Sequence, residues 1–279
     1  LCWLDEQSYG ELVALCQFLP GPASSQVGFA LGVLRGNGLA GGLAAWLGFT
    51  LPSAIFLCLC ALGAGALSGP LASGLLHGLK LVAVAVVAHA LWGMVRSLTP
   101  DWQRLSIAGA ALALVSLFQQ PAVQAAAIVA GMLAGLWLCR APASSATRCL
   151  AFPVGRRRGA AALILFAALL AGLPLLAAMA HDPGLTLFTS FYRAGALVFG
   201  GGHVVLPLLQ AETVSPGFVS EQAFLAGYGM AQAVPGPLFT FAAYLGTLHP
   251  HAASGIGGAA IALFAVFLPG LLLVYGALP

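Results

Sequence analysis

Long, uninterrupted runs of apolar residues are the feature that most constrains the fold of this chain. Several of these runs approach or exceed the roughly 20 residues that an α-helix needs to cross a bilayer. The strands of a transmembrane barrel would alternate apolar and polar residues, and these runs do not. Only 6% of the 279 residues are charged, whereas a typical soluble domain has about 25%. The sequence therefore predicts an all-α, polytopic integral membrane protein.

Two of the apolar segments are interrupted by proline, at Pro20-Gly21-Pro22 and at Pro235-Gly236-Pro237, and a third by the glycine triplet 200–202. A further proline, Pro52, is expected to bend its segment. The segments are expected at about 8–34, 40–66, 72–97, 105–119, 122–139, 160–180, 186–211, 222–248 and 255–278.

A basic linker separates the two halves of the chain. Residues 140–158 hold five arginines and no acidic residue, which is half of the 10 Lys and Arg in the chain. Basic loops lie on the cytoplasmic side of membrane proteins, so we expect a cytoplasmic linker and not a nucleic-acid site. The predicted organisation is an N-terminal repeat at 1–139, this linker, and a C-terminal repeat at 159–279.

The two halves carry one motif twice. Glu6-Gln7 corresponds to Glu221-Gln222, and Pro20-Gly21-Pro22 corresponds to Pro235-Gly236-Pro237 at the same spacing and without a gap. Further on, Leu51-Pro52 meets Leu268-Pro269. Two copies with matching flanks predict an internal duplication. The segment that precedes Glu221 has no counterpart before Glu6, so we expect the first repeat to lack its first helix.

Each Pro-Gly-Pro is expected to break its helix. Proline removes a backbone donor and pushes the preceding residue out of the helical region. Unpaired backbone groups cost several kcal/mol each in hydrocarbon, so such a break survives only where protein or water lines it. A half-helix that starts after Pro22 or Pro237 would point its N-terminal amides into the break, where they attract anions. Paired broken helices of this kind are typical of transporters, although a kinked scaffold is the alternative.

Several other polar residues can be interpreted either as functional or as structural. The glycines before His203 could expose amides or could only allow close helix packing. Arg193 either reaches an interface or faces an aqueous cavity. Lys80 lies deep enough in its segment to be costly unless it faces the protein interior. Glu6 and Glu221 lie at helix starts, where capping is their ordinary role.

These motifs resemble the CHR family of chromate ion transporters. The resemblance rests on Phe199 to His203, Glu221-Gln222 and Gln232 to Pro237, and on Gln17 to Pro22 with Gln26 in the first half. It implies two homologous halves and the export of chromate, a tetrahedral oxyanion related to sulfate. The candidate substrate-binding residues are Gln17, Pro20, Gly21, Pro22, Gln26, Lys80, Arg193, Gly200, Gly201, Gly202, His203, Gln232, Pro235, Gly236 and Pro237.

The sequence thus favours a multi-pass transporter of the cytoplasmic membrane that exports chromate. The alternatives are a transporter of another anion such as sulfate, a non-transporting membrane subunit, and an integral-membrane enzyme. No catalytic residue, metal ligand set or cofactor is expected: Cys58 and Cys60 lie in an apolar run without a nearby His or acidic residue. The expected partners are the oxyanion and the lipid bilayer, and a homo-oligomer is left open.

The orientation of the linker can be tested by cysteine labelling. With Cys149 kept as the only cysteine, a membrane-impermeant maleimide should leave it unmodified in intact cells and should modify it in inverted vesicles, because the basic segment faces the cytoplasm. Labelling of Cys149 in intact cells would reverse the predicted topology.

Overall fold

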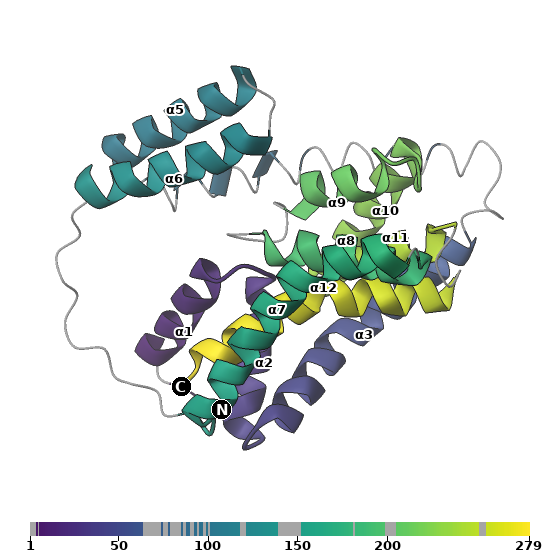
Figure 1. Ribbon diagram of the computed structural model, residues 1–279, viewed down its shortest axis with the longest axis horizontal. Coiled ribbons are helices and arrows are strands. Elements are labelled where there is room, and N and C mark those ends of the chain that lie inside the picture. The colour runs from purple at the N-terminus through teal and green to yellow at the C-terminus, as the bar shows by residue number, and fades with distance from the viewer. Residues whose placement is uncertain are drawn as a thin grey trace. The chain divides into compact units, whose positions relative to one another are not determined.

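The computed structural model of this chain is built from helices (Figure 1). It describes residues 4, 6–63, 101–117, 121–138, 152–180, 182–198, 205–250 and 255–279, together with isolated positions between 74 and 99. No strand occurs within those residues, so the all-α prediction is confirmed. The segment expected at 72–97 lies almost entirely outside the described residues.

The chain divides into two compact units, and residues 84–149 form one of them. Its described helices are α5 (Trp102–Leu117) and α6 (Pro121–Leu138), which pack against each other. Large apolar side chains on both helices stay exposed, among them Leu112, Leu117 and Trp137. Exposed apolar surface of this kind marks contact with lipid or with another protein.

The other unit comprises residues 1–83 and 150–279. Its helices agree with the expected segments within a few residues, and both Pro-Gly-Pro motifs fall between helices. The elements are α1 (Glu6–Phe18), α2 (Ala23–Arg35), α3 (Leu39–Gly63), α7 (Arg156–Ala180), α8 (Pro183–Ala196), α9 (Val205–Thr213), α10 (Glu221–Ala233), the 3₁₀ turn η2 (Leu238–Thr240), α11 (Phe241–Leu248) and α12 (Ile256–Ala277).

The C-terminal helix α12 forms the centre of this unit. It contacts α2, α3, α7, α8 and α11, and it runs among them in Figure 1. Ala262, Val266 and Phe267 on this helix are fully buried. A helix that is apolar on every side is expected in the interior of a protein or of a membrane. Helix α12 is packed among other helices, and its composition also suits the interior of a membrane.

Three of the described helices, α3, α7 and α12, are long and apolar enough to cross a membrane. Helix α7 exposes large apolar side chains along its length, including Ile164 and Leu175. Helix α3 does the same on one face, through Leu51, Ile55 and Leu59. These surfaces fit lipid as the surrounding solvent, as the composition predicts.

Glycines bring the neighbouring helices of this unit close together. A Cβ at Gly32 in α2 would lie 2.5 Å from the carbonyl oxygen of Gly41 in α3. The turn between these helices contains Asn37 at φ 53°. Helix α11 meets α12 in the same way, because a Cβ at Gly246 would collide with the Gly258 carbonyl. Small residues at such contacts are the usual means by which membrane helices pack backbone to backbone.

This packing predicts different outcomes for two glycines on neighbouring helices. Gly32→Val should lower the free energy of unfolding by about 1–3 kcal/mol or more, because the added side chain overfills the contact with Gly41. Gly48→Ala is the control: no heavy atom lies within 4 Å of its added Cβ, and Ala is the better helix former. Thermal unfolding of the detergent-solubilised protein measures both, and an equal loss in the two variants would contradict the described α2–α3 contact.

Candidate functional site

The first Pro-Gly-Pro separates α1 from α2. Helix α1 ends at Phe18, and α2 begins at Ala23 after Pro22, which occupies the N-cap position. Between them Gly21 has φ 119°, a conformation that only glycine adopts without strain. The N-terminus of α2 has no side-chain cap, so its first amides depend on other partners.

The second Pro-Gly-Pro separates α10 from η2. Helix α10 ends at Ala233, Gly236 has φ 156°, and Pro237 precedes the 3₁₀ turn η2, which leads into α11. The Thr240 hydroxyl donates to the Pro237 carbonyl at 2.8 Å. The chain therefore leaves this break through a tight turn instead of a full α-helical turn, and the two breaks differ in detail.

Each break lies against a proline-containing long helix from the other half of the chain. A Cβ at Gly21 would lie 2.9 Å from the Cα of Gly270, which follows Pro269 in α12. A Cβ at Gly236 would lie 2.6 Å from the Cβ of Ser53, which follows Pro52 in α3. The arrangement is reciprocal, as the predicted internal duplication leads one to expect. Whether the two halves superpose stays a prediction.

Gln26 fastens the first break to α12. Its side-chain Nε2 donates to the Pro20 carbonyl at 2.8 Å and to the Gly270 carbonyl at 3.1 Å, while the Gly21 amide donates to the Val198 carbonyl at 2.8 Å. Two carbonyl acceptors fix which end of the amide is nitrogen. The Oε1 atom of Gln26 is therefore an acceptor, and it is buried without a hydrogen-bond partner.

Three further buried polar atoms in the described residues have no partner, and they lie on α2 and α3. They are Ser25 Oγ, Trp46 Nε1 and Thr50 Oγ1. A Cβ added at Gly42 in α3 would meet Val33 and Phe29 of α2. Ser25 lies about two turns before Val33, and Thr50 lies about two turns after Gly42. The antiparallel pairing of the two helices therefore predicts that Ser25 and Thr50 face each other. We call Ser25, Gln26, Trp46 and Thr50 the polar cluster.

The part of the polar cluster on α3 lies near the middle of a long apolar helix. Thr50 is close to the centre of α3, which runs from Leu39 to Gly63. The Trp46 ring packs against Phe267 of α12 with centroids 5.7 Å apart, and Phe239, just after the second break, packs against the same ring at 5.9 Å. Both breaks thus border the same stretch of α12. Substrate sites of transporters lie near the bilayer midplane between broken helices.

The other residues singled out from the sequence have varied positions. Gln17 is exposed on α1, and Gln232 is partly buried on α10, where its Nε2 donates to the Tyr228 hydroxyl at 2.8 Å. Arg193 forms an ion pair with Glu212, in which its Nε donates to Oε1 at 3.0 Å. Lys80, together with the motif Gly200, Gly201, Gly202 and His203, lies outside the described residues.

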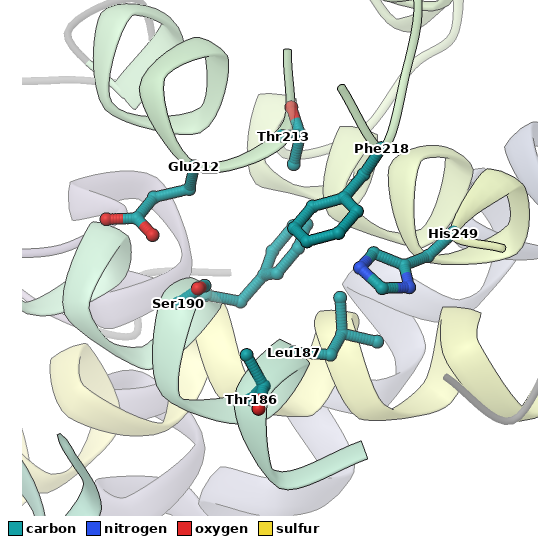
Figure 2. A pocket seen from close by; sticks show the side chains of 8 residues that line it. Thr186, Leu187, Ser190, Glu212, Thr213, Phe218 and His249 are labelled. Atoms are coloured by element: carbon teal, nitrogen blue, oxygen red, sulfur yellow. The ribbon is translucent and has the colours of Figure 1, made fainter. Parts of the chain in front are cut away.

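A small pocket lies between α8, α9 and the end of α11, beside the Arg193–Glu212 pair. Figure 2 shows Glu212 and His249 on opposite sides of it. The Phe218 ring packs on the His249 imidazole with centroids 4.4 Å apart. The pocket adjoins the middle of α8, from Thr186 to Phe191, whereas the first break contacts Val198 beyond the end of that helix. Among the described residues, no group of three or more His, Cys, Asp or Glu side chains could hold a metal ion.

Comparison with known proteins identifies the family. The sequence profile of the chromate transporter family matches residues 1–136 and 185–279. The chain belongs to the chromate transporter family. It is 28% identical to the chromate transport protein of Pseudomonas aeruginosa over 96% of this chain and 62% of that one. It is 27% identical to that of Cupriavidus metallidurans, over 96% and 63%.

The chain is also 24% identical to an uncharacterized transporter of Methanocaldococcus jannaschii, over 99% of this chain and 67% of that one. The chain thus spans less than two thirds of the length of the two bacterial relatives. No solved structure matches it. Together with the long apolar helices, family membership establishes a multi-pass membrane protein and confirms the resemblance drawn from the sequence.

The family match contains both breaks and omits residues 137–184, which comprise the basic linker and α7. The matched parts therefore supply the polar cluster and the helices that surround it. Ser25, Trp46 and Thr50 were not among the residues singled out from the sequence. The available signal was a polar stripe on an apolar helix: Trp46, Thr50 and Ser53 recur at helical spacing and share the buried face of α3.

The structure separates the roles of two glutamines that the sequence treats alike. Gln26→Leu should lower the free energy of unfolding, because the Pro20 carbonyl, which lies between helices, loses its donor at a cost of about 1–3 kcal/mol. Gln17→Leu, on the exposed face of α1, should change it by less than about 0.5 kcal/mol. Thermal unfolding in detergent compares the two variants. A Gln26 variant as stable as the Gln17 variant would contradict a structural role for the hydrogen bonds of Gln26.

Proposed function

We propose that the intact protein exports chromate, or a closely related tetrahedral oxyanion, across the cytoplasmic membrane. The observation that carries the proposal is the uncapped N-terminus of α2, which opens from a buried break beside unpaired polar groups. The names of the P. aeruginosa and C. metallidurans relatives, both chromate transport proteins, indicate the substrate class. No catalytic residue is assigned, because binding and release of an unchanged ion require none.

The start of α2 suits an anion for two physical reasons. The first amides of a helix have no partner within the helix, and the helix dipole places about half a positive charge at that end. Inside a membrane this end can persist only if protein or a ligand satisfies those amides. Pro22 at the N-cap offers no side-chain oxygen. A ligand with several acceptor oxygens would supply the hydrogen-bond acceptors that the first amides of α2 lack.

The glycine motif and the basic side chains complete the proposed site. Val198, which accepts a hydrogen bond from Gly21, directly precedes Phe199 and the glycines at 200–202, so their amides are proposed to contribute further donors. Lys80 is proposed to add positive charge. The guanidinium of Arg193 is engaged by Glu212, which reduces the charge it can offer. His203, Gln232 and the second break are proposed to border the same path.

Transport measurements in inverted membrane vesicles test this function. Vesicles from cells that express the intact protein should accumulate radiolabelled chromate, since export in the cell becomes uptake in inverted vesicles. A parallel measurement with radiolabelled sulfate distinguishes the two tetrahedral dianions. Uptake of sulfate alone would reassign the substrate, and uptake of neither anion would favour a non-transporting subunit.

The role of Lys80 is tested in the same vesicles. If its ammonium group supplies charge to the anion, Lys80→Gln should reduce chromate uptake more than Lys80→Arg, because arginine keeps the charge. A hydrogen bond to a charged partner contributes about 1.5–3 kcal/mol, which corresponds to roughly a tenfold loss of apparent affinity or more. Uptake is normalised to membrane abundance by immunoblot, and equal uptake in both variants would remove Lys80 from the site.

A further inference from the structure

The unpaired atoms of the polar cluster require an explanation. A buried polar group without a partner is uncommon in a native protein, because its lost hydration is not replaced. Three side chains of the polar cluster each hold a polar atom without a partner. Each of them is at least nine-tenths buried, with exposed fractions of 1% for Ser25, 6% for Trp46 and 0% for Thr50. Such a cluster is expected where a ligand or an ordered water completes the hydrogen bonds.

The chemistry of these atoms limits the ligand. An indole N–H can only donate, so whatever lies against Trp46 Nε1 must be an acceptor. The hydroxyls of Ser25 and Thr50 can donate as well. Helix α3 contains no charged residue, and the only one in α2 is Arg35 at its far end. A metal cation would meet an N–H that cannot coordinate it and no carboxylate on either helix.

The location of these atoms agrees with an anion. Ser25 belongs to the first turn of α2, whose unpaired amides carry the positive end of the helix dipole. The antiparallel pairing of α2 with α3 predicts that Thr50 faces that turn, and Trp46 lies one turn from Thr50 on the same buried face. Donors from two helices therefore border the uncapped N-terminus, and the helix end does not stand alone.

We propose that Ser25, Trp46 and Thr50 are specificity-determining residues that hold the oxyanion through neutral hydrogen-bond donors beside the N-terminus of α2. This proposal rests on the proposed function and names the groups that perform it. It places recognition in the first break and on α3. The second break helps to position α3, because Gly236 packs against Ser53 of the same polar stripe.

A single substitution separates this role from a structural one. Thr50→Val keeps the shape of the side chain and removes its hydroxyl. Because that hydroxyl has no protein partner, the melting temperature of the anion-free protein should stay the same or rise. The KM for chromate uptake should rise about tenfold or more, as expected for a lost hydrogen bond to a charged ligand. Ser25→Ala should show the same pattern of retained stability and raised KM. Trp46→Phe should also raise the KM, with some loss of stability because a smaller ring replaces a buried indole.

Thr247→Val is the matched control. Thr247 is also buried, but its hydroxyl donates to the Ala243 carbonyl at 2.7 Å within α11. Its replacement should leave the KM unchanged. The vesicles are those that test the proposed function, so the wild-type protein reports on transport and the ratio of variant to wild type reports on the cluster.

The outcomes are distinguishable. If wild-type vesicles take up chromate and Thr50→Val leaves the KM unchanged, the cluster is not the binding site while the proposed function stands. A lower melting temperature for Thr50→Val, with uptake reduced only in proportion to abundance, would assign the hydroxyl to a structural water and overturn the proposal. Uptake of neither chromate nor sulfate by the wild type would overturn both the function and this inference.

Discussion

Hydrocarbon offers no hydrogen bonds, and this constraint explains why the two broken helices look as they do. Every backbone amide and carbonyl that a proline frees must find a partner inside the protein. At the first break the freed groups are met by Gln26 and by the Val198 carbonyl, and the glycine at its centre touches Gly270. Removing any of these contacts would leave polar backbone in an apolar medium. The break is therefore an anchored structural element, and the packing of α2, α8 and α12 is organised around it.

The two long helices α3 and α12 each pack against the break of the other half of the chain. Helices α3 and α12 are apolar enough to cross the membrane, yet each places a residue after its internal proline against the break of the other half. The contacts are not identical: Gly270 meets Gly21 through backbone, whereas Ser53 meets Gly236 through its side chain. The first break also leads into a 13-residue helix, while the second leads into a short 3₁₀ turn. The two Pro-Gly-Pro breaks therefore differ, and only the first of them leads directly into a full α-helix.

Sequence reasoning recovered the features that depend on local chemistry. Apolar length predicted the helices, and the effect of proline on the backbone predicted both breaks. Gln17 and Gln26 show where this reasoning ends. Both lie within a few residues of the same Pro-Gly-Pro, but Gln26 is fully buried and Gln17 is exposed, because the face of a helix that meets α12 is decided by packing across more than 240 residues of chain. Ser25 and Thr50 were overlooked for another reason: a hydroxyl in a membrane helix ordinarily bonds the carbonyl one turn earlier, so sequence alone does not reveal that these two lack a partner.

Neutral hydrogen-bond donors in the proposed site have consequences for transport that buried charges do not. A transporter must bind its ion firmly enough to select it and weakly enough to release it on the other side, a balance that conduction through selectivity filters also requires. A lysine or arginine buried against a dianion would bind more strongly and would have to be neutralised or moved before release. Glu212, one residue before the end of α9 at Thr213, pairs with Arg193 beside a separate pocket. This cation is therefore engaged elsewhere, and in the proposed site the helix end, its neutral donors and Lys80 would set the strength of binding.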